Sequence, residues 1–160
     1  MESNPKPAHV EPPRGAYQAR VDDKGRLKLP AAFQQYLNDL GESKVFITSL
    51  DVRIARIYPI SVWKENEALF DSASEDPEAA EDIAFIANDL GADSEIDSQG
   101  RVLVPSELRR MLGLENQPVW LDCYKGRINI YGKEIYEQRK ARAMESVAEK
   151  LKTLERRGLK

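Results

Sequence analysis

An internal repeat is the feature of this sequence that most constrains its fold. The segment VDDKGRLKLPAAF at 21–33 returns as IDSQGRVLVPSEL at 96–108, an offset of 75 residues. The similarity extends past this motif, because KVFITSLDVRIARIYPISVW at 44–63 resembles PVWLDCYKGRINIYGKEIY at 118–136. A run of matched positions this long indicates a duplicated structural unit. Any predicted fold must therefore give both copies the same local structure.

Each copy predicts the same order of elements: a short strand, a D-x-x-G-R loop, a second short strand, a short helix that begins at a proline, and a hairpin. Gly25 and Gly100 supply the positive φ that a tight connection needs. Residues 26–29 alternate polar and apolar, as a half-buried strand does, whereas residues 101–104 are more apolar and predict a strand buried on both faces. The expected class is α+β, mainly β.

Helices are expected in the rest of the chain. Two helical stretches surround an acidic SEDPE turn between the copies. One long helix is predicted over residues 133–158, with Met144, Val147, Leu151 and Leu154 forming a single apolar stripe that packs on the core or on a neighbouring subunit. The predicted organisation is a disordered head at 1–13, a first repeat domain at 14–63, an acidic helical connector at 64–93, a second repeat domain at 94–136 and a C-terminal helix at 137–160.

Composition limits the classes of function. The chain has 160 residues, of which 41% are hydrophobic and 32% charged, and this favours a soluble globular protein. No apolar run is long enough for a membrane-spanning helix, and the first residues lack the apolar core of a secretory signal. Cys123 is the only cysteine, which excludes an internal disulfide and a cysteine-based zinc site and suits a reducing cytoplasm. His9, the only histidine, lies in the head and argues against histidine-based catalysis or metal binding.

The distribution of charge matters more than its sum. A net charge of -3 argues at first against a nucleic-acid partner. However, residues 64–99 carry twelve acidic side chains against one lysine, whereas residues 133–160 carry nine basic side chains against five acidic ones. Local charge therefore has to decide which partner the protein binds.

The first D-x-x-G-R loop has the composition of a DNA-binding loop. Gly25 lets the backbone approach a phosphate closely, Lys24 offers a point charge, and Arg26 offers a fork that binds phosphate or the O6/N7 edge of guanine. Lys28 adds a third cation to the first copy, whereas Arg101 is the only cation in the corresponding positions of the second. We therefore expect the first copy to dominate DNA contact and the second mainly to complete the fold.

The acidic residues of the loops are expected to brace them. A carboxylate that faces phosphate is repelled by it, so Asp22 and Asp97, together with Gly100, are interpreted as structural. The same reasoning leaves an alternative open for Arg26, which would then only brace its hairpin through Asp22. Arg14 is a further candidate for DNA contact, and Arg20 is a less favoured one.

These motifs resemble those of the MraZ family, bacterial transcriptional regulators built from two SpoVT/AbrB-type swapped-hairpin domains in one polypeptide. The resemblance covers residues 14–136: Arg14-Gly15 stands at the opening Arg-Gly, 22–26 and 97–101 match the two D-x-x-x-R motifs, and YPISVW resembles the Tyr-Pro…Trp segment. It implies a duplicated AbrB-like swapped-hairpin β-barrel with flanking helices and a long C-terminal helix. The chain departs from the family pattern where EDIAFIANDLGADSE replaces an Arg-rich stretch, in its longer head, and at Tyr136, where tryptophan is common.

The resemblance also implies a function. The protein would be a sequence-specific repressor of the division and cell-wall gene cluster that forms a ring-shaped homo-oligomer. It would bind direct repeats in its own promoter and insert its paired motif loops into double-stranded DNA. We expect a cytoplasmic, nucleoid-associated protein with no cofactor, metal, membrane contact or small-molecule ligand.

Three alternatives remain open. An AbrB-like transition regulator or antitoxin is the first, although antitoxins usually carry one motif copy and a disordered toxin-binding tail. An enzyme that pairs Asp22 with Asp97 is disfavoured, because the adjacent arginines would keep both carboxylates ionised, and so no catalytic residue is expected. A purely structural ring protein is the third. The side chains expected in the core outside the repeat motifs are Trp63, Trp120, Cys123 and Tyr131.

Overall fold

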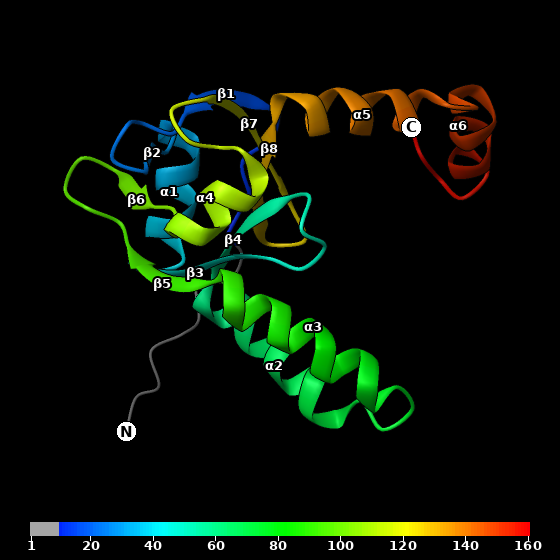
Figure 1. The fold of residues 1–160 in the computed structure, drawn as a ribbon. Coiled ribbons are helices and arrows are strands. Elements are labelled where there is room, and N and C mark those ends of the chain that lie inside the picture. The colour runs from blue at the N-terminus through cyan, green and yellow to red at the C-terminus, as the bar shows by residue number, and fades with distance from the viewer. Residues whose placement is uncertain (1–9) are drawn as a thin grey trace, which may run out of the picture.

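The computed structural model describes residues 10–160, so His9 and most of the head predicted to be disordered lie outside the described residues (Figure 1). In chain order the elements are β1 (Tyr17–Arg20), β2 (Arg26–Lys28), α1 (Ala31–Asp39), β3 (Lys44–Ser49), β4 (Ala55–Pro59), α2 (Ile60–Ser72), α3 (Pro77–Leu90), β5 (Ala92–Glu95), β6 (Arg101–Leu103), α4 (Ser106–Leu112), β7 (Pro118–Tyr124), β8 (Arg127–Gly132), α5 (Lys133–Met144) and α6 (Val147–Glu155). The class is α+β with antiparallel strands, as the sequence predicts, but the helices contain more residues than the strands, so the expectation of a mainly β fold is wrong.

The strands of the two repeats interleave in one six-stranded sheet of order β1-β7-β8-β4-β3-β5. β1 of the first repeat pairs with β7 of the second, with Tyr17 opposite Leu121. β5 of the second repeat pairs with β3 of the first, with Lys44 opposite Glu95. β2 and β6 form a separate two-stranded ribbon. Neither repeat therefore completes its sheet without strands from the other.

Local sequence signals explain where the elements begin and end. Pro30 and Pro105 precede the first residues of α1 and α4, where a missing N–H costs nothing. Gly113 ends α4 in the left-handed conformation, with φ of 64°. The two predicted hairpins are present as β3–β4 and β7–β8, and the two helices predicted around the SEDPE turn are α2 and α3.

Both repeats contribute to one hydrophobic core. Equivalent positions such as Leu29 and Val104 are fully buried in it. A second cluster under the α2–α3 hairpin consists of Phe46, Tyr58, Trp63 and Ala87.

Two of the four other side chains expected in the core are buried. Trp63 and Tyr131 are each only 7% exposed. Cys123 and Trp120 are half-buried. Trp120 instead stacks on Tyr136 with ring centroids 5.0 Å apart, and this contact holds α5 against the sheet.

Two local predictions are wrong. The strand of residues 101–104 is not buried on both faces, because Leu103 is 54% exposed: the β2–β6 ribbon turns only one face to the core. The tail is not one long helix, because Glu145 is extended and Ser146 takes a φ of 52° between α5 and α6. Helical continuity depends largely on packing an apolar face, and the tail stripe stays exposed.

The motif loops and the projecting helices lie on different sides of the molecule. In Figure 1 the D-x-x-G-R loops before β2 and β6 lie on the left of the body, while the α2–α3 hairpin and the α5–α6 tail project to the right. The acidic hairpin is therefore held away from the loops.

Candidate nucleic-acid interface

The first motif loop, residues 22–26, is closed by the side chain of Asp22. Its Oδ1 accepts hydrogen bonds from the backbone N–H of Lys24 at 2.9 Å and of Arg26 at 2.8 Å. Its Oδ2 accepts one from Nε of Arg26 at 3.0 Å. Gly25 adopts the expected positive φ, 81°, and its N–H donates to the Asp22 carbonyl at 3.0 Å. One carboxylate thus organises the whole loop.

The second motif loop, residues 97–101, repeats this geometry. Oδ1 of Asp97 accepts from the backbone N–H of Gln99 and of Arg101, both at 2.9 Å, and Oδ2 accepts from Nε of Arg101 at 2.8 Å. Gly100 has a φ of 75°. The residues that the two loops share are therefore sufficient to set the geometry, although the residues between them differ.

These hydrogen bonds keep both acids ionised. The backbone N–H of Arg26 is the main group that lowers the pKa of Asp22, assisted by the side chain of the same arginine. Arg101 lowers the pKa of Asp97 in the same way. Each carboxylate is thus held by its own arginine, and the structure does not pair the two acids as a proton-sharing dyad would require.

Each motif arginine is held at one end and free at the other. Within residues 10–160, Nε of Arg26 and of Arg101 donates to the loop aspartate, while their terminal nitrogens donate no hydrogen bond. The side chains of Arg26 and Arg101 are 33% and 25% exposed. The geometry therefore combines the two interpretations of Arg26: its Nε braces the loop and its terminal nitrogens remain able to donate.

The two motif loops lie at opposite ends of the β2–β6 ribbon. The strands run antiparallel, with Leu27 opposite Val102. The N–H of Val104 donates to the Gly25 carbonyl at 2.9 Å, and the N–H of Leu29 donates to the Gly100 carbonyl at 3.0 Å. Each loop is thus tied to the strand of the other repeat, which relates the two loops by an approximate two-fold symmetry.

This symmetry changes where Lys28 acts. Its Nζ donates a hydrogen bond to the carbonyl of Gln99, in the second motif loop. The structure therefore places this cation of the first copy beside the second motif loop. At the equivalent place beside the first loop stands Leu103, which is uncharged and exposed.

Two side chains from the short helices also reach the motif loops, and the sequence interpretation missed both. Arg109 of α4 packs on Gly25, where an added Cβ would lie 2.0 Å from its Nη1. Gln34 of α1 packs on Gly100, where an added Cβ would lie 2.2 Å from its Cδ. Residues 34 and 109 are equivalent in the repeat, but the sequence gives no sign that each crosses to the other copy.

A family comparison places these loops among known proteins. A family model described as "MraZ protein, putative antitoxin-like" matches residues 14–86 and 91–158. The chain belongs to the MraZ family. The first matched segment begins at Arg14 and contains the first motif loop, and the second contains the other loop and the whole of α5 and α6.

Curated relatives agree with this assignment. A protein named transcriptional regulator MraZ from Heliobacterium modesticaldum is 34% identical over 143 residues, covering 86% of this chain and 94% of that one. The protein of the same name from Acetivibrio thermocellus is 33% identical over 146 residues, covering 88% and 96%. The one from Acidobacterium capsulatum is 41% identical over 96 residues, covering 60% of this chain and 66% of that one.

The remaining arginine candidates of this MraZ chain lie outside the motif loops. Arg14 pairs with Glu11 at 3.7 Å, and its side chain is 79% exposed. Arg20 donates to the carbonyl of Asn116 at 2.9 Å. Neither forms a hydrogen bond with a motif loop in the described part of the chain.

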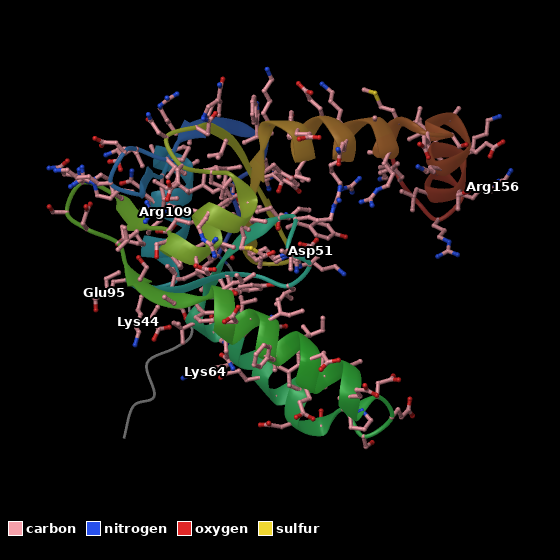
Figure 2. All side chains as sticks on the ribbon, in the orientation of Figure 1. Lys44, Asp51, Lys64, Glu95, Arg109 and Arg156 are labelled. Atoms are coloured by element: carbon pink, nitrogen blue, oxygen red, sulfur yellow. The ribbon has the colours of Figure 1, made fainter. Side chains whose placement is uncertain are left out.

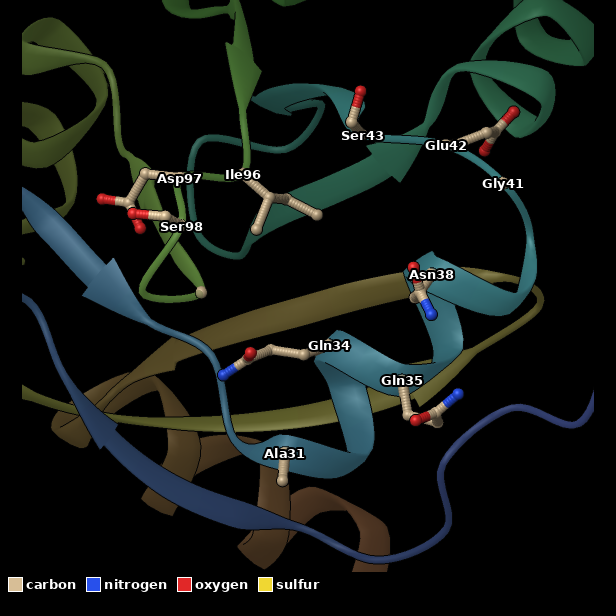
Figure 3. Close-up of a pocket in the computed structure, with 11 residues that line it drawn as sticks. Ala31, Gln34, Gln35, Asn38, Gly41, Glu42, Ser43, Ile96, Asp97 and Ser98 are labelled. Carbon is tan, nitrogen blue, oxygen red and sulfur yellow. The ribbon is translucent and has the colours of Figure 1, made fainter.

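A polar cavity adjoins the second motif loop (Figure 3). It has a volume of about 630 Å³. The α1 amides of Gln34, Gln35 and Asn38 line one side, and Asp97 and Ser98 line the other. Neutral amides at a loop of this kind can donate to and accept from base edges.

Neither a metal site nor a membrane-spanning helix is present among residues 10–160. No group of three or more histidine, cysteine, aspartate or glutamate side chains there could hold a metal ion. No helix in that range is both long and apolar enough to cross a bilayer.

Proposed function

We propose that this protein is a transcriptional regulator that binds double-stranded promoter DNA in a sequence-specific way through its two motif loops. The observation that carries the proposal is the pair of arginines, Arg26 and Arg101, each fixed at Nε with its terminal nitrogens left to donate. The names of the MraZ relatives support the regulatory role.

The loop geometry suits DNA recognition physically. An arginine already held by an aspartate loses little conformational freedom on binding, so more of each new hydrogen bond becomes affinity. The planar guanidinium matches guanine O6/N7 or two phosphate oxygens. Gly25 and Gly100 leave room for a backbone contact.

The acidic character of the chain is compatible with this proposal. Most acidic residues of the 64–99 segment lie on α2 and α3, which project away from the motif loops (Figure 1). The loop region itself carries four cations against three acids, which is a local excess of positive charge: Lys24, Arg26, Lys28 and Arg101 against Asp22, Asp23 and Asp97.

Assembly into a ring is the second part of the proposal. The tail stripe is exposed at Met144, Val147, Leu151 and Leu154, by 48% to 60%. Apolar faces of this kind usually pack on a partner, and a second copy of the chain is the partner we propose. Several subunits on repeated boxes would multiply a weak single contact.

The finer assignments follow from the family. The interleaved strands support a swapped-hairpin fold. We propose that the protein represses the division and cell-wall gene cluster from direct repeats in its own promoter, in the cytoplasm and in association with the nucleoid. Footprinting the purified protein on DNA upstream of its own gene tests this: protection of regularly spaced boxes is expected, and absence of protection at low salt would overturn the proposal.

An antitoxin is the second candidate, because the family model carries the words "putative antitoxin-like". The exposed tail stripe would then cover a toxin rather than a second subunit. A toxin gene adjacent to this one, together with a stable complex of the two purified products, would favour this function over the first.

A further inference from the structure

We propose that Arg109 forms part of a DNA phosphate-binding site at the first motif loop, and that the second loop lacks this contact because Gln34 stands at the equivalent place. The inference rests on the proposed DNA-binding function and adds to it a residue from the opposite repeat.

The guanidinium of Arg109 occupies the space that a side chain at residue 25 would fill. A Cβ on Gly25 would lie 2.0 Å from Nη1 and 2.2 Å from Cζ of Arg109, so any side chain at residue 25 would displace the guanidinium. The side chain of Arg109 is only 14% exposed. Figure 2 marks Arg109 on the side of the body that carries the motif loops. The guanidinium therefore forms the underside of the first loop.

This guanidinium has donors without acceptors. Within residues 10–160 it makes no hydrogen bond, and Nε is buried with no partner. Its nearest carboxylate oxygen is Oε1 of Glu115, 3.9 Å from Nη1, on a side chain that is 62% exposed. Arginine stays charged and offers five N–H donors, and leaving such donors unmet in a buried place is costly. Nε therefore lacks an acceptor, and the terminal nitrogens have only a long ion pair with the exposed Glu115.

The surroundings favour an anionic acceptor. The first loop also carries Lys24 and Arg26, and its acids are Asp22, which is bonded to Arg26, and the exposed Asp23. With Arg109 the loop gathers three cations against these two acids, so an incoming phosphate meets a net positive charge while it accepts the unused hydrogen bonds. In a DNA-binding loop the phosphate is that of the backbone.

The second motif loop provides an internal comparison. At Gly100 the side chain of Gln34 replaces Arg109, and its Nε2 donates to the Leu29 carbonyl at 2.6 Å. That amide is neutral, and its Nε2 already has an acceptor. The added cation of the second loop is Lys28, bonded to the Gln99 carbonyl at the loop surface. The two loops thus offer phosphate different sites, which would fix the orientation of each subunit on DNA.

The test uses this comparison as its control. Arg109→Gln gives the first loop the side chain that the second already has, so we expect it to fold. Promoter binding should weaken, and the slope of log K against log salt should flatten by roughly 0.9 per engaged subunit. Gln34→Arg, the reciprocal variant, should bind more tightly and steepen the slope.

DNA in which single phosphates are made neutral identifies the phosphate that Arg109 contacts. Promoter DNA with single methylphosphonate substitutions should show one position where wild-type affinity falls while that of Arg109→Gln falls no further. Should Arg109→Gln fail to fold, Arg109→Lys in the same scan serves instead, since a point charge should weaken but keep the dependence on that phosphate.

The outcomes separate the two proposals. An unchanged salt slope in Arg109→Gln, or a methylphosphonate profile identical to that of the wild type, would overturn the role of Arg109. A loss of affinity that vanishes once the folded fraction is corrected would do the same. Wild-type protein that binds no promoter DNA at low salt would instead overturn the proposed function itself.

Discussion

Nζ of Lys28 donates a hydrogen bond to the backbone carbonyl of Gln99, 71 positions further along the chain. A cation encoded in the first repeat is thereby fixed at the second motif loop. In return, Arg109 of the second repeat packs on Gly25 of the first loop. Each loop is therefore built from both repeats, and the charge at its surface is not the charge of its own sequence motif alone.

This relationship makes the salt dependence of binding a test of individual side chains. Lys24→Gln and Lys28→Gln should each weaken promoter binding and flatten the slope of log K against log salt by roughly 0.9 per engaged subunit, because each removes one counterion-releasing contact. A salt titration of affinity measures both effects.

Gln99→Ala is the matched control. It removes a neutral amide but keeps the carbonyl that holds Lys28, so affinity and slope should change far less. A loss from Gln99→Ala as large as that from Lys24→Gln would mean that the second loop reads DNA through its amide as strongly as the first does through its charge.

Substitution of Arg26 distinguishes a role in DNA binding from a role in bracing the loop. Its ion pair with Asp22 is partly exposed, so solvent screens it and it contributes little to stability. Its terminal nitrogens, as a DNA contact, should be worth roughly 1–3 kcal/mol in each engaged subunit. Arg26→Ala should therefore abolish promoter binding with little change in Tm. A large fall in Tm, with affinity retained per folded molecule, would instead show that Arg26 only braces the loop.

The loop aspartates predict a dependence of stability on pH. The pKa of Asp22 is lowered from 3.8 in the folded protein, chiefly by the backbone N–H of Arg26. The contribution of the carboxylate is then fully present above pH 3.8 and is lost as the pH falls through the folded pKa. Asp22→Asn should thus have a lower Tm than the wild type at neutral pH, and the gap should close below pH 3.8. Thermal unfolding at several pH values measures the gap, and a gap that widens in acid would contradict the assignment.

Much of this fold could be predicted from the sequence, because interactions between residues close together in the chain determine it. The loop bonds of Asp22 and Asp97 span two to four residues, so the motif residues alone determine them. Pro30, Pro105 and the hairpins follow from equally local signals. The resemblance to the family supplied the expectation of exchanged hairpins.

The contacts that side chains make between the two repeats could not be predicted from the sequence. The offset of 75 shows that Gln34 and Arg109 are equivalent, but equivalence is compatible with contact inside one repeat or across both. Leu103 is apolar and yet exposed, because burial depends on which face of the ribbon meets the core. The helix is interrupted at Ser146 although no proline or glycine lies beside this residue, so the sequence does not predict the interruption.

The tail supplies the last prediction, which concerns assembly. Leu151 and Leu154 are 48% and 52% exposed on α6, and burying a leucine against a neighbour contributes about 1.5–3 kcal/mol. Leu151→Asp with Leu154→Asp should shrink the assembly on a sizing column and weaken binding to a repeated array, because avidity needs several linked subunits. Thr153→Asp, whose side chain bonds the Glu149 carbonyl on the same helix, adds a charge outside the stripe and should leave both unchanged. A double variant of wild-type size, or wild-type protein that binds a lone box as tightly as an array, would contradict assembly through the tail stripe.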